Sequence, residues 1–167
     1  MKNYRARIIA GAIMLAGSVV FLGCGSDHMD AGGTELRSGM DKSRSGLIVV
    51  DRGIGAFQTG ERAAGLNDMG KGMATMTESM ADMRSGLGMM SMKMMSGCGG
   101  SSDEMMKPFE TGLGEMRAAH SMMLDDDPSN DDAALVRMQK GRKSAADAVD
   151  AMGSRMSCMG HGSAGMM

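Results

Sequence analysis

Methionine, cysteine and histidine are the side chains in this sequence whose numbers and spacing could support chemistry. The 167 residues include 25 Met, 3 Cys and 3 His. Thioether and thiolate sulfur select Cu(I), and by the same softness Ag(I), over zinc or magnesium. A thioether loses no proton near neutral pH and, unlike a thiol, cannot be lost to a disulfide. These residue types therefore favour binding of a soft monovalent metal.

The densest group of thioethers lies between Met69 and Met95. Apolar residues recur there at alternating steps of four and three, from Met69 to Met94, as in the apolar stripe of an amphipathic helix. Such a stripe is more often core than ligand. Near the end of the stretch, however, methionines point all round the helix axis, and packing alone does not require that. We expect metal ligands in this last part: Met89, Met90, Met92, Met94, Met95 and the following Cys98.

Two further groups of candidate ligands lie on the segments that follow. If the helices run alternately up and down, the end of the fourth segment meets the Met69–Met95 stretch at one pole, together with Met105 and Met106. That pole would gather Met156, Cys158, Met159 and His161 beside Cys98. A possible second site at the other pole contains Met116, His120 and Met123. Two alternatives stay open: Cys98 and Cys158 can form a disulfide, and His120 can be a hydrogen-bonded histidine.

Four helical segments must position these residues. Apolar residues at alternating steps of three and four recur from Leu36 to Phe57, along the methionine stretch, from Met106 to Met123 and from Leu135 to Met159. Ser101 to Glu104 has the form of a capping box, and Pro128 follows an acidic turn as a helix-start signal. Thr34 could cap the first segment. The sequence predicts an all-α fold, an antiparallel four-helix bundle, with a three-helix bundle as the alternative.

The first segment carries the least certain of these patterns. Its glycines each cost about 1 kcal/mol against alanine in a helix interior, although small residues also let helices approach closely. The run from Leu47 to Val50 could instead form a short strand. We divide the chain into a signal peptide (1–23), a lipidated Cys24 with a flexible tether (24–33), a helical bundle (34–159) and a flexible tail (160–167).

The N-terminus has the features of an export signal. Lys2, Arg5 and Arg7 precede an apolar stretch of about fifteen residues, which is short for a membrane span. It ends in Phe21-Leu22-Gly23-Cys24, which resembles the lipobox of bacterial lipoproteins. The resemblance implies acylation of Cys24 after cleavage and a protein anchored to the cell envelope. The lack of Asp after the Cys resembles sorting to the outer membrane, facing the periplasm.

The methionine spacing also resembles that of known metal-binding proteins. Met92-Lys93-Met94, and the pairs Met73 with Met76 and Met80 with Met83, resemble the M-x-M and M-x-x-M motifs of periplasmic copper- and silver-binding proteins. We therefore expect a protein that buffers Cu(I) or Ag(I) or passes it to a metal-exporting or metal-accepting protein. The alternatives are a lipoprotein that binds a protein partner through a pliable methionine surface, and an oxidant sink that cycles methionine through its sulfoxide.

Other functional classes lack their signatures in this sequence. We find no nucleophile elbow, no H-E-x-x-H, no phosphate-binding glycine loop and no paired carboxylates placed for acid–base chemistry. The formal net charge is −2, and no basic patch is interleaved with aromatic residues. We therefore expect neither an enzyme nor a nucleic-acid-binding protein.

Overall fold

A computed structural model of the chain describes residues 31–90, 101–125 and 127–161, and the side chains of these residues up to 157. They form α1 (Ala31–Gln58), α2 (Arg62–Met89), α4 (Ser102–Leu124), a short 3-10 helix η1 (Pro128–Asn130) and α5 (Asp131–His161). The prediction of an all-α helical bundle is confirmed. The three-helix alternative is wrong, because the glycine-rich first segment forms α1. The possible strand at 47–50 is also wrong, because these residues are helical.

Helix ends follow the local sequence signals. The Ser101 hydroxyl accepts a hydrogen bond from the Glu104 amide, and the Glu104 carboxylate accepts one from the Ser101 amide, so the predicted capping box is present. The Asp127 carboxylate caps η1 by accepting from the Ser129 amide at 3.0 Å. Thr34 does not cap α1, which is already helical at Ala31 and therefore includes Gly32 and Gly33.

Glycines explain how α1 and α2 pair. Small residues recur every seven positions on both helices: Gly32, Gly39, Gly46 and Gly53 on α1, and Gly65, Gly72, Ser79 and Gly86 on α2. A Cβ atom added to Gly32, Gly46 or Gly53 would lie 2.7 Å from the carbonyl oxygen of Gly86, Gly72 or Gly65, respectively. The contacts run in opposite chain directions, so α1 and α2 form a hairpin with touching backbones. The loss of helix propensity at these glycines is offset by this close packing.

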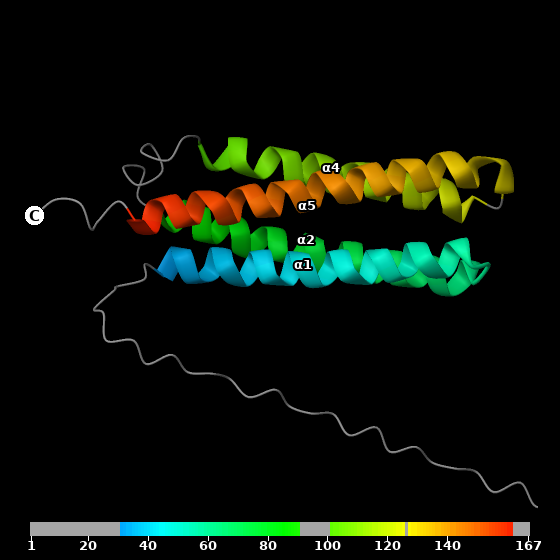
Figure 1. The fold of residues 1–167 in the computed structure, drawn as a ribbon, viewed down its shortest axis with the longest axis horizontal. Helices are drawn as coiled ribbons and strands as arrows, with labels where there is room; N and C mark the ends of the chain where they lie inside the picture. The colour runs from blue at the N-terminus through cyan, green and yellow to red at the C-terminus, as the bar shows by residue number, and fades with distance from the viewer. Residues whose placement is uncertain (1–30, 91–100, 126, 162–167) are drawn as a thin grey trace, which may run out of the picture.

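A second hairpin, α4–α5, has the same kind of seam over a shorter distance. A Cβ atom on Gly112 would lie 2.6 Å from the carbonyl oxygen of Gly141 and 2.7 Å from the amide nitrogen of Ala145. Contacts between the two hairpins are made by side chains. Figure 1 shows α4 and α5 stacked over α1 and α2 along their full lengths. The bundle is therefore two tightly paired hairpins with a wider space between them.

Methionine fills much of that space. Half of the buried hydrophobic side chains in the described residues are methionines. Met69, Met76 and Met83 of α2 are fully buried and also pack against α1, since a Cβ atom added to Gly53, Gly46 or Gly39 would lie within 2.8 Å of their Cγ atoms. Met is unbranched and adaptable, so it fills irregular gaps between helices that do not touch. Within the α1–α2 hairpin, Ser43 and Ser79 are the buried polar exceptions; their hydroxyl oxygens lie 2.6 Å apart.

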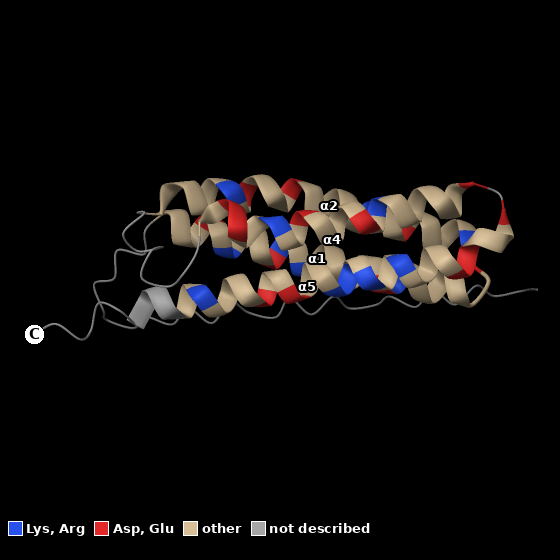
Figure 2. Ribbon diagram, turned by 90° about the horizontal axis from the view of Figure 1, so that it is seen from above, with Lys and Arg blue, Asp and Glu red and all other residues tan. Residues whose placement is uncertain are grey.

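Charged residues are spread along all four long helices (Figure 2), and none of those that the structure describes is buried. Several link neighbouring helices, including Arg84 with Glu110 between α2 and α4, at 2.7 Å. In the part of the chain that the structure describes, no helix is both long enough and apolar enough to cross a membrane.

Candidate soft-metal site at one end of the bundle

The bundle has two ends with different chemistry. At one end α1 and α4 begin and α2 and α5 finish, at the left of Figure 1; we call this the near end. At the opposite, far end, the α1–α2 turn meets η1. The turn has Gly60 at φ +91°, a conformation that favours glycine.

Methionines from three helices lie at the same level in the near end. The ion pair between Arg84 and Glu110 aligns α2 with α4, so Met90, six residues beyond Arg84, lies level with Glu104 and the adjacent Met105. The contact between Gly112 and Ala145 aligns α4 with α5. Seven residues from that contact, on the two antiparallel helices, are Met105 and Met152. Met90, Met105 and Met152 therefore share one layer of the core.

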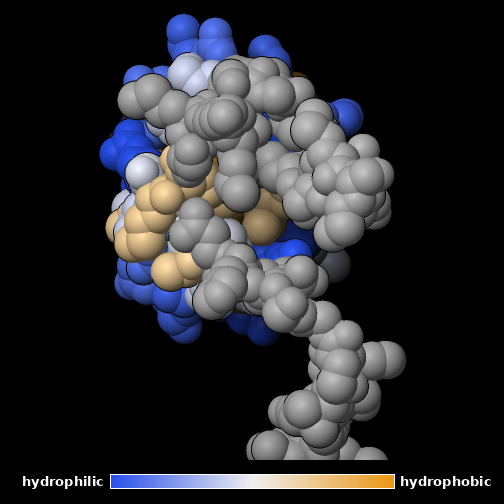
Figure 3. Space-filling view, turned by 90° about the vertical axis from the view of Figure 1, so that its left-hand side faces the viewer, coloured by the Kyte–Doolittle hydropathy of each residue, from blue (hydrophilic) through white to orange (hydrophobic). Residues whose placement is uncertain are grey.

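These methionines differ in their exposure to solvent. Met90 and Met105 are each 7% exposed, and Met106 and Met152 are each 2% exposed. Met156, one turn beyond Met152, is half-buried, and Met89 is 50% exposed. Figure 3 looks onto this end and shows apolar atoms inside a hydrophilic rim. The thioethers of the near end therefore range from half-exposed to fully buried.

The predicted ligands at this end are described only in part. Met89, Met90 and Met156 lie there, as expected. Other predicted ligands lie outside the described residues (Met92, Met94, Met95 and Cys98) or have side chains that are not described (Cys158, Met159 and His161). Sequence reasoning placed Met105 and Met106 at this end but did not select Met152. Its position on the apolar stripe of the fourth segment was the available signal.

The local electrostatics favour a singly charged ion over a doubly charged one. Thioethers are neutral, so a bound metal adds its full charge to this layer. Arg155 lies between Met152 and Met156 on α5, and its buried Nη1 atom has no hydrogen-bond partner. Repulsion by this guanidinium rises with the charge of the metal. The described residues contain no group of three or more His, Cys, Asp or Glu placed to hold a metal.

The second predicted group, Met116, His120 and Met123, is arranged differently. Met116 and Met123 are fully buried in the core. His120 is half-buried, and its Nε2 lies 2.9 Å from the carbonyl oxygen of Leu66. A carbonyl oxygen only accepts, so Nε2 carries a proton and donates it, which leaves only Nδ1 for a ligand. This geometry favours the alternative of a hydrogen-bonded histidine between α4 and α2.

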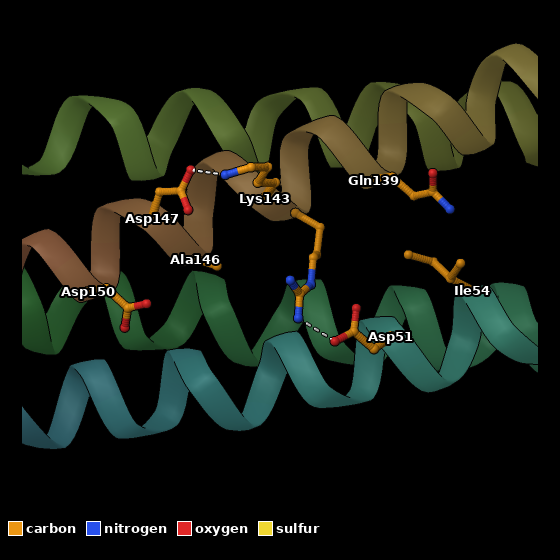
Figure 4. A pocket seen from close by; sticks show the side chains of 8 residues that line it. Asp51, Ile54, Gln139, Lys143, Ala146, Asp147 and Asp150 are labelled. Atoms are coloured by element: carbon orange, nitrogen blue, oxygen red, sulfur yellow. Dashed lines mark hydrogen bonds and ion pairs between the residues drawn. The ribbon is translucent and has the colours of Figure 1, made fainter.

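A groove between α1 and α5 contains five charged residues but is not a comparable site (Figure 4). Arg142 pairs with Asp51, Lys143 with Asp147, and Asp150 with Arg44 of α1. These partners neutralise one another at the surface. The groove therefore offers neither a net charge nor the soft ligands found at the near end.

Comparison with known proteins identifies no relative of this chain: no family model matches it, and no curated protein or solved structure is significantly similar.

Proposed function

We propose that this chain is a lipid-anchored, extracytoplasmic protein that binds and buffers Cu(I) or Ag(I) at the near end of its helical bundle. The observation that carries the proposal is the layer of Met90, Met105 and Met152, which come from three chain segments and have the half-exposed Met89 next to Met90 in the sequence. Core packing explains a buried methionine on each helix. It does not explain the exposed thioether of Met89 at the same end.

The ligand chemistry supports a soft monovalent ion. Neutral thioethers bind Cu(I) and Ag(I) and discriminate against hard divalent ions. Because no proton is displaced from a thioether, its affinity for metal should change little between neutral and mildly acidic pH. Weak, exchangeable sites suit buffering and transfer to a metal-exporting or metal-accepting protein.

The proposed anchor places this site close to a membrane. Cys24, the proposed acylated residue, precedes Ala31 by seven residues, which span at most about 25 Å when fully extended. Because α1 begins at the near end, the methionine layer would lie near the lipid surface, within reach of a membrane-bound metal carrier.

The proposal is tested by anaerobic titration of the mature chain with Cu(I) against a chromophoric Cu(I) chelator. We expect retention of at least one ion per chain. A variant with Met89, Met90 and Met105 all changed to Leu should lose most of this retention. The matched control changes Met69, Met76 and Met123 to Leu; these are buried methionines away from the near end. Equal loss in both variants, or no retention by the natural chain, would contradict the proposal.

Binding of a protein partner through the exposed apolar surface of the near end is the second candidate function. The half-exposed Met89 favours it, because flexible methionines adapt to varied apolar partners. An oxidant sink fits the described residues less well, because most of their methionines are buried. Mild peroxide followed by peptide mapping tests this third possibility: methionines that stay intact while neighbouring proteins are oxidised would exclude a sink.

A further inference from the structure

We propose that a bound soft ion at the near end bridges the two hairpins, with Met90 of α2 as ligand from one and Met105 or Met106 of α4 and Met152 of α5 as ligands from the other. This inference rests on the proposed function and deepens it. It states which described thioethers form the site, and that metal binding fastens one hairpin to the other.

The helices pack more closely within each hairpin than between the two hairpins. Inside the α1–α2 hairpin, Gly46 and Gly72 bring the backbones into contact, and inside α4–α5, Gly112 and Gly141 do the same. Across the hairpins, a Cβ atom added to a described glycine would come close only to side-chain ends: on Gly70 it would lie 3.6 Å from His120 Nε2, and on Gly153 it would lie 3.6 Å from Arg44 Nη2. Side-chain packing alone therefore sets the separation of the hairpins.

The polar links that join the two hairpins differ between the two ends of the bundle. At the far end, Arg62 of α2 donates hydrogen bonds to the Asp131 carboxylate of α5 and to the Met123 carbonyl of α4. The Arg62 guanidinium also lies 5.0 Å from the centre of the Phe57 ring. One partly buried side chain thus ties both hairpins together there.

At the near end the described polar links between hairpins are exposed. Arg84 pairs with Glu110 at 59% and 35% side-chain exposure, and the next described link, Arg44 with Asp150 toward the middle of the bundle, has 46% and 76%. Exposed ion pairs contribute little to stability. Beyond them lies the methionine layer, which belongs to the shared core, and within the described residues no side-chain hydrogen bond or ion pair involves Met90, Met105 or Met152.

The register of α2, α4 and α5 brings methionines from both hairpins to one level of the bundle. Met90, Met105 and Met152 share one layer, and Met106 adjoins it. The thioether torsions are soft, so these side chains can converge on an ion without backbone strain. Met105, Met106 and Met152 all belong to the α4–α5 hairpin, so a site that includes Met90 draws ligands from both hairpins.

The test is hydrogen–deuterium exchange of the mature chain with and without Ag(I), combined with Ag(I) affinity measurements. A bridging ion should slow exchange at least threefold in the last two turns of α2 and, at the same time, in the first two turns of α4. The variants M90L and M152L should each weaken Ag(I) binding at least tenfold and abolish the paired protection. The substitutions nearly conserve side-chain volume, and circular dichroism verifies the fold.

The control variants M69L and M138L change equally buried methionines of α2 and α5 outside this layer, and should keep both affinity and protection. Protection confined to one hairpin, or tight binding retained by M90L, would overturn the bridge and leave the proposed function standing. Absence of Ag(I) and Cu(I) binding by the natural chain would overturn both.

Discussion

Gly46 and Gly72 touch through their backbones at the middle of the α1–α2 hairpin. A Cβ atom on Gly46 would lie 2.7 Å from the Gly72 carbonyl oxygen, and one on Gly72 would lie 2.5 Å from that of Gly46. The contact is reciprocal and involves groups that cannot rotate away. The spacing between α1 and α2 is therefore fixed by main-chain atoms, whereas the spacing between hairpins is fixed by flexible side chains.

Substitution of Gly46 by alanine should destabilise the protein. The added methyl group must push the two backbones apart, which we expect to lower the free energy of unfolding by about 2 kcal/mol. The matched control is Gly55→Ala on the same helix, where a Cβ meets nothing within 4 Å. This change should raise stability by about 0.5–1 kcal/mol through helix propensity. Urea unfolding measures the free energy of unfolding of both variants. Similar effects of the two substitutions would contradict close backbone contact at Gly46.

The effects of replacing the buried serines Ser43 and Ser79 on the free energy of unfolding should be strongly coupled. Ser79 donates its proton to the Met76 carbonyl oxygen at 2.8 Å, so Ser43 must be the donor between the two hydroxyls. Ser79→Ala leaves Ser43 with the Met83 sulfur at 3.9 Å as its remaining partner, at a cost of about 1–2 kcal/mol. The double variant S43A/S79A should be less destabilised than the sum of the two single changes. Additive effects in a double-mutant cycle would show that the hydroxyls act independently.

Loss of the Arg62 side chain should loosen the far end. Arg62→Met removes charge-assisted hydrogen bonds to Asp131 and the Met123 carbonyl oxygen, and we expect a loss of about 2–3 kcal/mol. Arg137→Met, which breaks an exposed pair with Glu115, is the control and should change stability by less than about 1 kcal/mol. Thermal unfolding of the two variants gives the comparison. A smaller effect for Arg62 than for Arg137 would remove it as the link between hairpins.

Acid titration should reveal the pairing of α1 with α2 outside the core. A hydrogen bond from Arg52 at 2.6 Å, and then its charge, hold the pKa of Asp68 below its ordinary value of 3.8. A carboxylate whose pKa is lowered by folding stabilises the native state above its unfolded pKa. That contribution is lost as the pH falls below about 4 and through the folded pKa.

The test is carboxyl NMR titration of the Arg52→Gln variant, in which the pKa of Asp68 should rise. The pKa of Asp127 is lowered mainly by its hydrogen bonds with Ser129 and should stay where it is. An Asp68 pKa that does not respond to loss of Arg52 would exclude the pair in solution.

The helices were predictable because apolar spacing and capping chemistry act locally. The capping box at Ser101 and the stripe from Met69 to Leu87 both required only neighbouring residues. The role of the glycines was predicted only in general terms: small residues were expected to let helices approach closely, but which glycines meet was not predicted, because their contact partners lie on another helix. The same limit applies to His120, whose partner is a main-chain carbonyl 54 positions away, which no residue type identifies.

At the near end, the sequence analysis selected Met89 and Met90 as candidate ligands but not Met152, because only the register of α4 and α5 brings Met152 into the layer.

The glycine seam also determines how freely this sequence can diverge. A core methionine of α2 can be exchanged for leucine or isoleucine with modest repacking, whereas a seam glycine has no substitute of equal size. A distant homologue could therefore keep this fold with few of the methionines and an altered ligand specificity. Such a homologue would still be recognisable by small residues that recur every seven positions on two successive, antiparallel helices.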